Sequence, residues 1–312
     1  MSLQSTLWQN AAEQPGQELE PIPPAADGTP AEAWLGGVHP EGQLEVTSGF
    51  HLHGDKFSRM LAYLAHERQA RGSVYKQLMQ STGMSNSQVQ ALVQYGTNMA
   101  LLVPRSLRVT PLGHLVLEHD PFFDRPGTLW LLHYLLASNP LLVVWNYMCN
   151  AILPGSGETS MAEASRQFLP FIGRWSEQSI RKNVRKELRA FFAGYTTAMF
   201  AGLEYLAETD KRHVYRVNRA VVPVPPLILL ATALIYRDRH LPGASGLEIP
   251  ALVYADHSPG RLTRQSETYL RQSLDRLHES GLLTIESKAN LDQVRFRVGG
   301  SWLVVVREYY EN

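Results

Sequence analysis

The segment Ser73–Asn98 restricts the possible folds more than any other part of this chain, because it contains two short amphipathic stretches separated by a glycine turn. The turn is Thr82-Gly83-Met84. Ser85 follows it, and Gln88 stands three residues later, which is the spacing of a capping box at a helix start. A helix, a glycine-containing turn and a capped second helix together predict a helix-turn-helix unit.

Two short β-prone runs, Leu101–Val103 and Leu107–Val109, follow this unit and predict a small hairpin, or wing. A similar order of signals occurs later in the chain, and it begins with a helix predicted over Ser160–Trp175. Ser176 is predicted to cap a helix that extends to about Phe192, and the alternating runs Leu203–Glu208 and His213–Val217 come after it.

A third copy of the pattern lies near the carboxyl end. A long amphipathic helix is predicted over about Gln265–Ser280, with Gly281 at the position where a helix commonly ends. Leu282–Lys288 and Gln293–Val298 are predicted to form the strands of the last wing.

These patterns predict a mainly α (α+β) fold with two to three helix-turn-helix or winged-helix units carrying small β-hairpin wings. The expected divisions are a tail at 1–45, a winged-helix unit at 46–125, a helical domain with a second helix-turn-helix and wing at 126–222, and a last winged-helix unit at 223–312. Residues 1–45 are rich in Pro, Gly, Ala, Gln and Glu, so we expect them to be disordered. A partner-binding motif around Trp34 is the alternative.

The net charge of zero averages two unlike parts of the chain. Residues 1–45 contain seven acidic side chains and no Lys or Arg, so all 29 basic residues lie in the remainder, against 22 acidic ones. This asymmetry favours a polyanionic partner for the body of the protein.

The basic residues are concentrated at positions that suit contacts with phosphates. Five of them recur with a spacing that predicts one stripe on the helix after Ser176. Others lie in the second wing and in the third unit, although Leu247–Val298 has as many acidic as basic residues. A solvated or internally paired face is the alternative for all of them. The predicted DNA-binding residues are Arg181, Lys182, Arg185, Lys186, Arg189, Lys211, Arg212, Arg261, Arg264, Arg271, Arg295 and Arg297.

The helix predicted over Ser85–Asn98 has no charged residue. Its polar side chains could pair with adenine bases, but packing against another domain or subunit is the favoured interpretation. The residues expected to be exposed there for base or partner contact are Gln88, Gln90, Gln94, Tyr95 and Asn98.

Signals for chemistry are weak. His51, His53 and Asp55 alternate as in some metal sites, but a linker that leads into a helix is the favoured interpretation. Cys149, the single cysteine, is expected to be an inert core thiol. No nucleophile elbow, Walker loop, dinucleotide-binding turn or HExxH motif is found, so we expect a non-enzymatic protein without a metal or cofactor. We also expect a cytoplasmic location, because no targeting signal or membrane span is seen.

Several stretches resemble a known family. The sequence Leu107-Arg108-Val109-Thr110-Pro111-Leu112-Gly113, followed by Asp120-Pro121 and Thr128-Leu129-Trp130-Leu131-Leu132-His133, is similar to the bacterial domain-of-unknown-function 4007 family. The likeness also includes Gly83–Ser87 before these stretches, and Pro225–Tyr236 and Ser258–Arg261 after them.

This resemblance implies a role in phage-defence islands, beside genes of DNA phosphorothioation or related systems. The chain departs from the family pattern at His53-Gly54-Asp55, where members carry a Gly-His-Glu motif, and at Asn86, where they carry Lys. Functions tied to those two places are therefore not carried over.

Together with this resemblance, which implies the antiviral context, the sequence predicts a non-enzymatic DNA-binding accessory subunit of a bacterial antiviral system. Its expected partners are double-stranded DNA and other proteins of a defence complex, and no membrane is expected. A winged-helix adaptor that contacts only proteins is the alternative. A transcriptional regulator of the defence operon is another alternative, and it would require a symmetric dimer.

Overall fold

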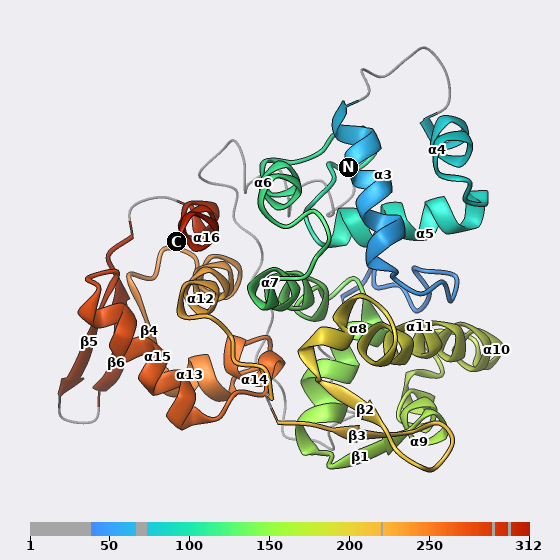
Figure 1. Cartoon of the computed structure of the whole chain (residues 1–312). Coiled ribbons are helices and arrows are strands. Elements are labelled where there is room, and N and C mark those ends of the chain that lie inside the picture. Colours follow the sequence, from blue (N-terminus) through green and yellow to red (C-terminus); the bar gives the residue numbers. More distant parts are fainter. Residues whose placement is uncertain (1–38, 67–73, 220, 289–290, 299–300) are drawn as a thin grey trace.

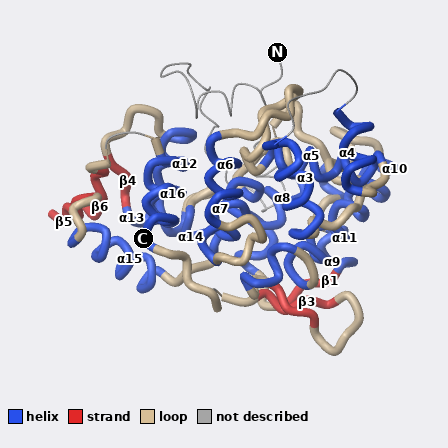
Figure 2. The backbone as a smooth tube through the Cα atoms, turned by 45° about the horizontal axis from the view of Figure 1, so that its top comes forward, coloured by secondary structure: helices blue, strands red, loops and turns tan. Residues whose placement is uncertain are grey.

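The computed structural model describes residues 39–66, 74–219, 221–288, 291–298 and 301–312. The chain is mainly helical, with two small antiparallel sheets of three strands each, which confirms the predicted fold class. The sheets lie at separate edges of a helical body (Figure 1, Figure 2).

The first unit consists of α3 (Gly54–His66), α4 (Val74–Thr82), α5 (Asn86–Asn98) and α6 (Pro111–His119). The predicted capping box at the start of α5 is present: Ser85 Oγ accepts from the amide of Gln88, and Gln88 Oε1 accepts from the amide of Ser85 at 3.0 Å. Gly83 has a φ of +69°, which turns the chain between α4 and α5.

The first predicted wing forms only as a short antiparallel pairing of its two runs. Leu102 and Val109 form an antiparallel bridge, and the amides of Val103 and Thr110 donate to the carbonyls of Arg108 and Leu101. Arg105 and Leu107 both adopt positive φ, and Pro104 has no amide hydrogen to donate. The connection therefore coils tightly, and regular strand pairing cannot extend along it.

The second unit begins with α7 (Pro126–Ala137) and α8 (Val143–Tyr147), then a π-turn (Met148–Ile152) and a 3₁₀ turn (Leu153–Gly155). It continues with the helices and strands that form its helix-turn-helix and sheet: β1 (Glu158–Ser160), α9 (Met161–Arg166), a 3₁₀ turn (Leu169–Phe171), α10 (Glu177–Ser179), a π-turn (Ile180–Val184), α11 (Arg185–Thr196), a 3₁₀ turn (Met199–Leu203), β2 (Leu206–Glu208) and β3 (Val214–Val217).

The third unit repeats the placement of the strands, with one before its helix-turn-helix and a hairpin after it, and it ends in an additional helix. It consists of α12 (Pro226–His240), β4 (Gly246–Glu248), α13 (Ile249–Tyr254), α14 (Pro259–Thr263), α15 (Glu267–Glu279), β5 (Leu283–Lys288), β6 (Leu291–Phe296) and α16 (Trp302–Glu311). The strand orders are β1-β3-β2 and β4-β6-β5. In each unit a short strand before the helix-turn-helix pairs with the second hairpin strand, as at Glu158–Arg216 and Gly246–Arg295.

Helix α7 of the second unit lies in the middle of the molecule, where it contacts α5 of the first unit and α12 and α14 of the third (Figure 1). Its His133 is completely buried, and its ring nitrogens lie at hydrogen-bond distance from the hydroxyl of Tyr195 and, at 2.9 Å, from the carbonyl of Leu262. Burial lowers the pKa of His133 to about 4, so this bridge between the second and third units is uncharged at neutral pH. Buried apolar residues from all three units form one continuous core.

The folded part begins earlier than the predicted tail boundary. Residues 39–45, placed in a disordered tail, pack on the body of the protein: Leu44 is buried, and Gln43 forms a parallel bridge with Leu142. That part of the prediction is wrong, and Trp34 lies outside the described residues.

The interior position of the single cysteine is as predicted. Cys149 is buried, and its burial raises the pKa of the thiol to about 12. Among the described residues, none of the helices combines the length and apolar character needed to cross a bilayer.

Candidate functional site

One continuous helix, formed by α10, the π-turn and α11 over residues 177–196, carries five of the basic residues that the sequence singled out. Ser176 caps it, as predicted, by accepting from the amide of Ser179. Ile180 and Val184 are buried on its inner face. The π-turn at Ile180–Val184 carries Arg181 and Lys182. Such turns insert one extra residue into a helix and occur often at functional sites, which favours a functional role for these two side chains.

The predicted single stripe is divided between two flanks of this helix. Arg181 and Arg185 face a groove together with residues of α9 and the β2–β3 turn. Lys186 lies on the other flank, where its ammonium group is 2.7 Å from Glu45. Lys182 and Arg189 are exposed.

The groove has a volume of about 710 Å³. Its cationic lining comes from three separate elements: Arg166 on α9, Arg181 and Arg185 on the basic helix, and Arg212 in the β2–β3 turn. Leu169 and Ile180 add apolar surface. No Asp or Glu belongs to the lining in the part of the chain that the structure describes.

The β2–β3 turn is held against α9, so the groove is preformed. The amide of Met161 donates to the carbonyl of His213 at 3.1 Å, and β1 pairs with β3 directly before α9 begins. Within the turn, the amide of Lys211 donates to Thr209 Oγ1 at 3.2 Å. These bonds fix the position of Arg212 relative to the helix.

The four groove arginines differ in how far they are neutralised. Arg181 is 2.6 Å from Glu177, and Arg166 pairs with Glu163. Both pairs are well exposed to solvent, so they contribute little stability and can exchange partners. Arg185 and Arg212 form no ion pair with any described residue.

The opposite flank of the helix contains a buried carboxylate. Glu187 accepts from the amides of Val46 and Thr47, each at 3.1 Å, from Thr47 Oγ1 at 2.9 Å and from Trp145 Nε1 at 3.0 Å. Burial raises the pKa of Glu187, and the bonds from Thr47 and Val46 oppose that rise. Glu187 thereby attaches the segment before α3 to the basic helix.

Two arginines of the third unit that were predicted to bind DNA instead make hydrogen bonds to the protein's own backbone. Arg261 donates to the carbonyls of Asn150 and Tyr254 and lies 3.3 Å from Asp256. Arg264 is half-buried and donates to the carbonyls of Asn218 and Leu153. They connect the third unit to the second, and we leave them out of the proposed interface.

The other basic residues of the third unit are mostly paired. Arg271 lies 2.9 Å from Glu267 and 2.6 Å from Asp292, and Arg295 lies 2.9 Å from Glu286. Arg297 is exposed near the end of β6. The structure therefore does not bring these residues together with the groove.

The side-chain exposure on the uncharged helix α5 differs in part from the prediction. Tyr95 and Asn98 are buried, so their expected accessibility is wrong. Tyr95 donates to the carbonyl of Phe50 at 3.2 Å, and Asn98 accepts from Asn139 at 2.8 Å, which are contacts within the chain. Gln90 is exposed, whereas Gln88 and Gln94 are partly buried.

The alternating histidines do not assemble a metal site. The rings of His51 and His53 have centroids 6.0 Å apart, and Asp55 pairs instead with Arg59 at 2.9 Å. Within the described ranges, no group of three or more His, Cys, Asp or Glu side chains is placed to hold a metal ion.

Sequence reasoning identified Arg181, Arg185 and Arg212 but missed Arg166 and the closeness of α9 to the wing. A helix was expected over Ser160–Trp175, but α9 ends at Arg166. Pro170 and the positive φ of Gly173 are incompatible with a continuous helix there. The proline and glycine were visible signals for this earlier end.

Fold and groove together define a mainly helical protein with two complete winged-helix units, one of which has a cationic groove beside its second helix. A family model described as "Protein of unknown function (DUF4007)" matches residues 89–310, and the chain belongs to this family. The resemblance seen in the sequence is thereby confirmed. Curated proteins give no match.

Two solved structures share the fold. A magnesium ion-bound SspB crystal structure has a TM-score of 0.72 and 16% identity, with 92% of this chain and 91% of the other covered. An SspB crystal structure has a TM-score of 0.71 and 15% identity, with 86% and 87% covered. At this identity the likeness shows a common fold.

Proposed function

We propose that this protein binds double-stranded DNA through the groove of its second unit, as a non-enzymatic accessory subunit of a cytoplasmic bacterial antiviral system. The observation that carries the DNA-binding proposal is that Arg181, Arg185 and Arg212, from two separate elements, line one groove without an acidic residue. The defence context is supported by the family resemblance alone.

The arrangement suits a duplex for two physical reasons. The second helix of a helix-turn-helix enters the major groove, while contacts from flanking elements to the phosphates fix its register. Here the basic helix is the second helix, and Lys211 and Arg212 lie in the adjoining wing. Arginine also binds phosphate oxygens bidentately, which favours it over lysine in such contacts.

The salt dependence of duplex binding tests this proposal. Four cations, Arg181, Lys182, Arg185 and Arg212, give an expected slope of about −3.6 for log affinity against log salt. Affinity should therefore fall about 150-fold between 50 and 200 mM salt. Fluorescence anisotropy with a labelled duplex measures it. A protein that does not bind the duplex at 50 mM salt would contradict the proposal.

Magnesium is bound in one of the two SspB structures that share the fold. Mg²⁺ prefers carboxylate oxygens and water, and the described residues of this chain offer no ready cluster of such ligands. The proposal includes no metal-dependent step. Incubation of the protein with supercoiled plasmid and Mg²⁺ checks this, because strand cleavage would refute the non-enzymatic part of the proposal.

A protein-binding adaptor is the second candidate. The ion pairs Lys186–Glu45, Arg271–Asp292 and Arg295–Glu286 favour it, because they cover basic side chains with the chain's own carboxylates. The adaptor predicts that the same titration gives no duplex binding at any salt concentration.

A further inference from the structure

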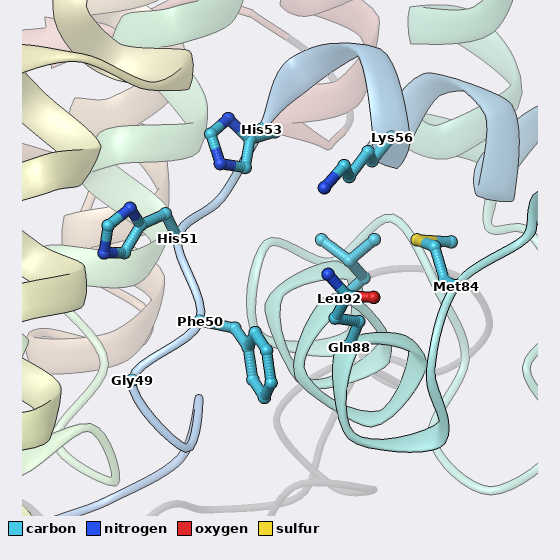
Figure 3. A pocket seen from close by; sticks show the side chains of 8 residues that line it. All are labelled: Gly49, Phe50, His51, His53, Lys56, Met84, Gln88 and Leu92. Carbon is cyan, nitrogen blue, oxygen red and sulfur yellow. The ribbon is translucent and has the colours of Figure 1, made fainter.

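A second, smaller hollow lies between the loop before α3 and the first turns of α5 (Figure 3). Its volume is about 170 Å³. Phe50, His51 and His53 come from the loop, Lys56 from α3, and Gln88 and Leu92 from α5.

The loop is anchored at three places, so the hollow exists before any ligand binds. The amide of Thr47 donates to Glu187 at 3.1 Å, the carbonyl of Phe50 accepts from Tyr95, and the carbonyl of Leu52 accepts from the amide of Met199 at 3.0 Å. A preformed site binds with less loss of conformational entropy than a loop that must be ordered.

Donors dominate the polar lining. Gln88 Oε1 already accepts from the amide of Ser85, and in Figure 3 the amide nitrogen of Gln88 lies on the side of Lys56. Lys56 extends toward Gln88 and Leu92 in the same view. Lys56 forms no ion pair with a described residue, and no Asp or Glu is among the described residues of the lining. The site therefore suits an anion that accepts hydrogen bonds.

The remaining surface is apolar. Phe50, Met84 and Leu92 form it. A ligand that combines a phosphate with a flat or apolar part, as a nucleotide does, satisfies both halves of the lining. A bare carboxylate would leave the apolar half without a partner.

The hollow adjoins the basic helix. A Cβ placed on Gly49 would lie 3.5 Å from the Cβ of Lys186, so the Gly49 backbone packs against α11. Gly49 has a φ of +78°, which favours glycine at this contact. The groove and the hollow therefore lie on the two flanks of one helix.

We propose that this hollow is a second phosphate-binding site, in which Lys56 and Gln88 Nε2 hold the phosphate and Phe50 and Met84 cover the adjoining nucleotide. The inference rests on the proposed function, and the phosphate is taken to be a backbone phosphate of the bound DNA. Free nucleotide has the same chemistry and is distinguished by the experiment.

The test substitutes Lys56→Met, which removes the charge and keeps most of the side-chain volume. Lys76→Met, at an exposed position on α4, is the matched control. Circular dichroism verifies that both variants fold. We expect K56M to lower the salt slope of duplex binding by about 1 and the affinity about eightfold at 0.1 M salt, and K76M to leave both unchanged. An unchanged slope for K56M, while the wild type binds, would overturn this inference and leave the groove proposal standing.

A separate titration identifies the source of the phosphate. The imidazole NMR signals of His51 and His53, assigned with His→Asn variants, are followed during addition of inorganic phosphate, adenosine monophosphate or a duplex. Shifts with the duplex alone support the backbone phosphate, and shifts with adenosine monophosphate that disappear in K56M support a free-nucleotide site. No shift with any of the three would overturn the proposal. If the wild type does not bind the duplex but adenosine monophosphate shifts these signals, the proposed function fails and the phosphate site remains.

Discussion

The double substitution Arg181→Glu/Arg185→Glu is expected to lower duplex affinity at least about 50-fold at 0.1 M salt and to reduce the salt slope by about 2. Each phosphate contact contributes nearly tenfold at that concentration, and the introduced carboxylates add repulsion. These two residues are the most informative choice because both line the groove. Lys186 is less informative, since Glu45 already neutralises it.

The matched control is Arg276→Glu/Arg307→Glu, which makes the same change in net charge at two exposed positions in the third unit. If affinity depended only on overall charge, both double variants would weaken binding equally. A loss confined to R181E/R185E supports the groove. Equal affinity for the wild type and R181E/R185E would exclude the groove as the binding site.

The substitution Glu187→Gln is expected to lower the free energy of unfolding by about 2–4 kcal/mol, because it places an amide donor among buried donors. The carboxylate accepts four hydrogen bonds, three of them from Val46 and Thr47. Glutamine can accept at one oxygen only. The raised pKa of Glu187 shows that burying its charge costs free energy. The neutral glutamine side chain avoids that cost. The loss of stability on substitution is therefore smaller than the loss caused by leaving a buried ion unpaired.

Urea denaturation measures this effect, with Glu279→Gln on the exposed surface of α15 as the control. We expect a clear shift of the midpoint for E187Q and almost none for E279Q. An E187Q midpoint equal to that of the wild type would mean that Glu187 does not hold the segment before α3. The preformed loop beside the hollow would then lose its main support.

Local signals predicted the helices well. The Ser85–Gln88 capping box and the cap at Ser176 start helices where they were expected, because caps and apolar spacing act within one or two turns. The strands β1 and β4 were not foreseen, since three residues are too few to show an alternating pattern. They form because a neighbouring hairpin strand, distant in sequence, supplies the pairing partner.

The site was predictable only in part. Helical spacing correctly grouped Arg181 with Arg185. It did not predict that Lys186 meets Glu45, a residue 141 positions away, or that Arg264 donates to backbone carbonyls. Such neutralisation depends on tertiary contacts, so the number of basic residues in a sequence overstates the free positive charge. The opposite happens at helix α5, which has no charged residue of its own. Lys56 of α3 brings a positive charge to the hollow beside this helix, and the sequence of α5 alone does not reveal it.

Site-specific crosslinking can establish whether DNA lies across the groove of the second unit. Cys149 is buried with a raised thiol pKa, so a single cysteine introduced at exposed Asp210, in the β2–β3 turn, can be labelled selectively with a photoactivatable group. Asp275→Cys on α15 provides the control position. We predict a crosslink to a duplex from position 210, which weakens with salt, and almost none from position 275. Crosslinking from 275 but not from 210 would show that the duplex lies elsewhere on the protein.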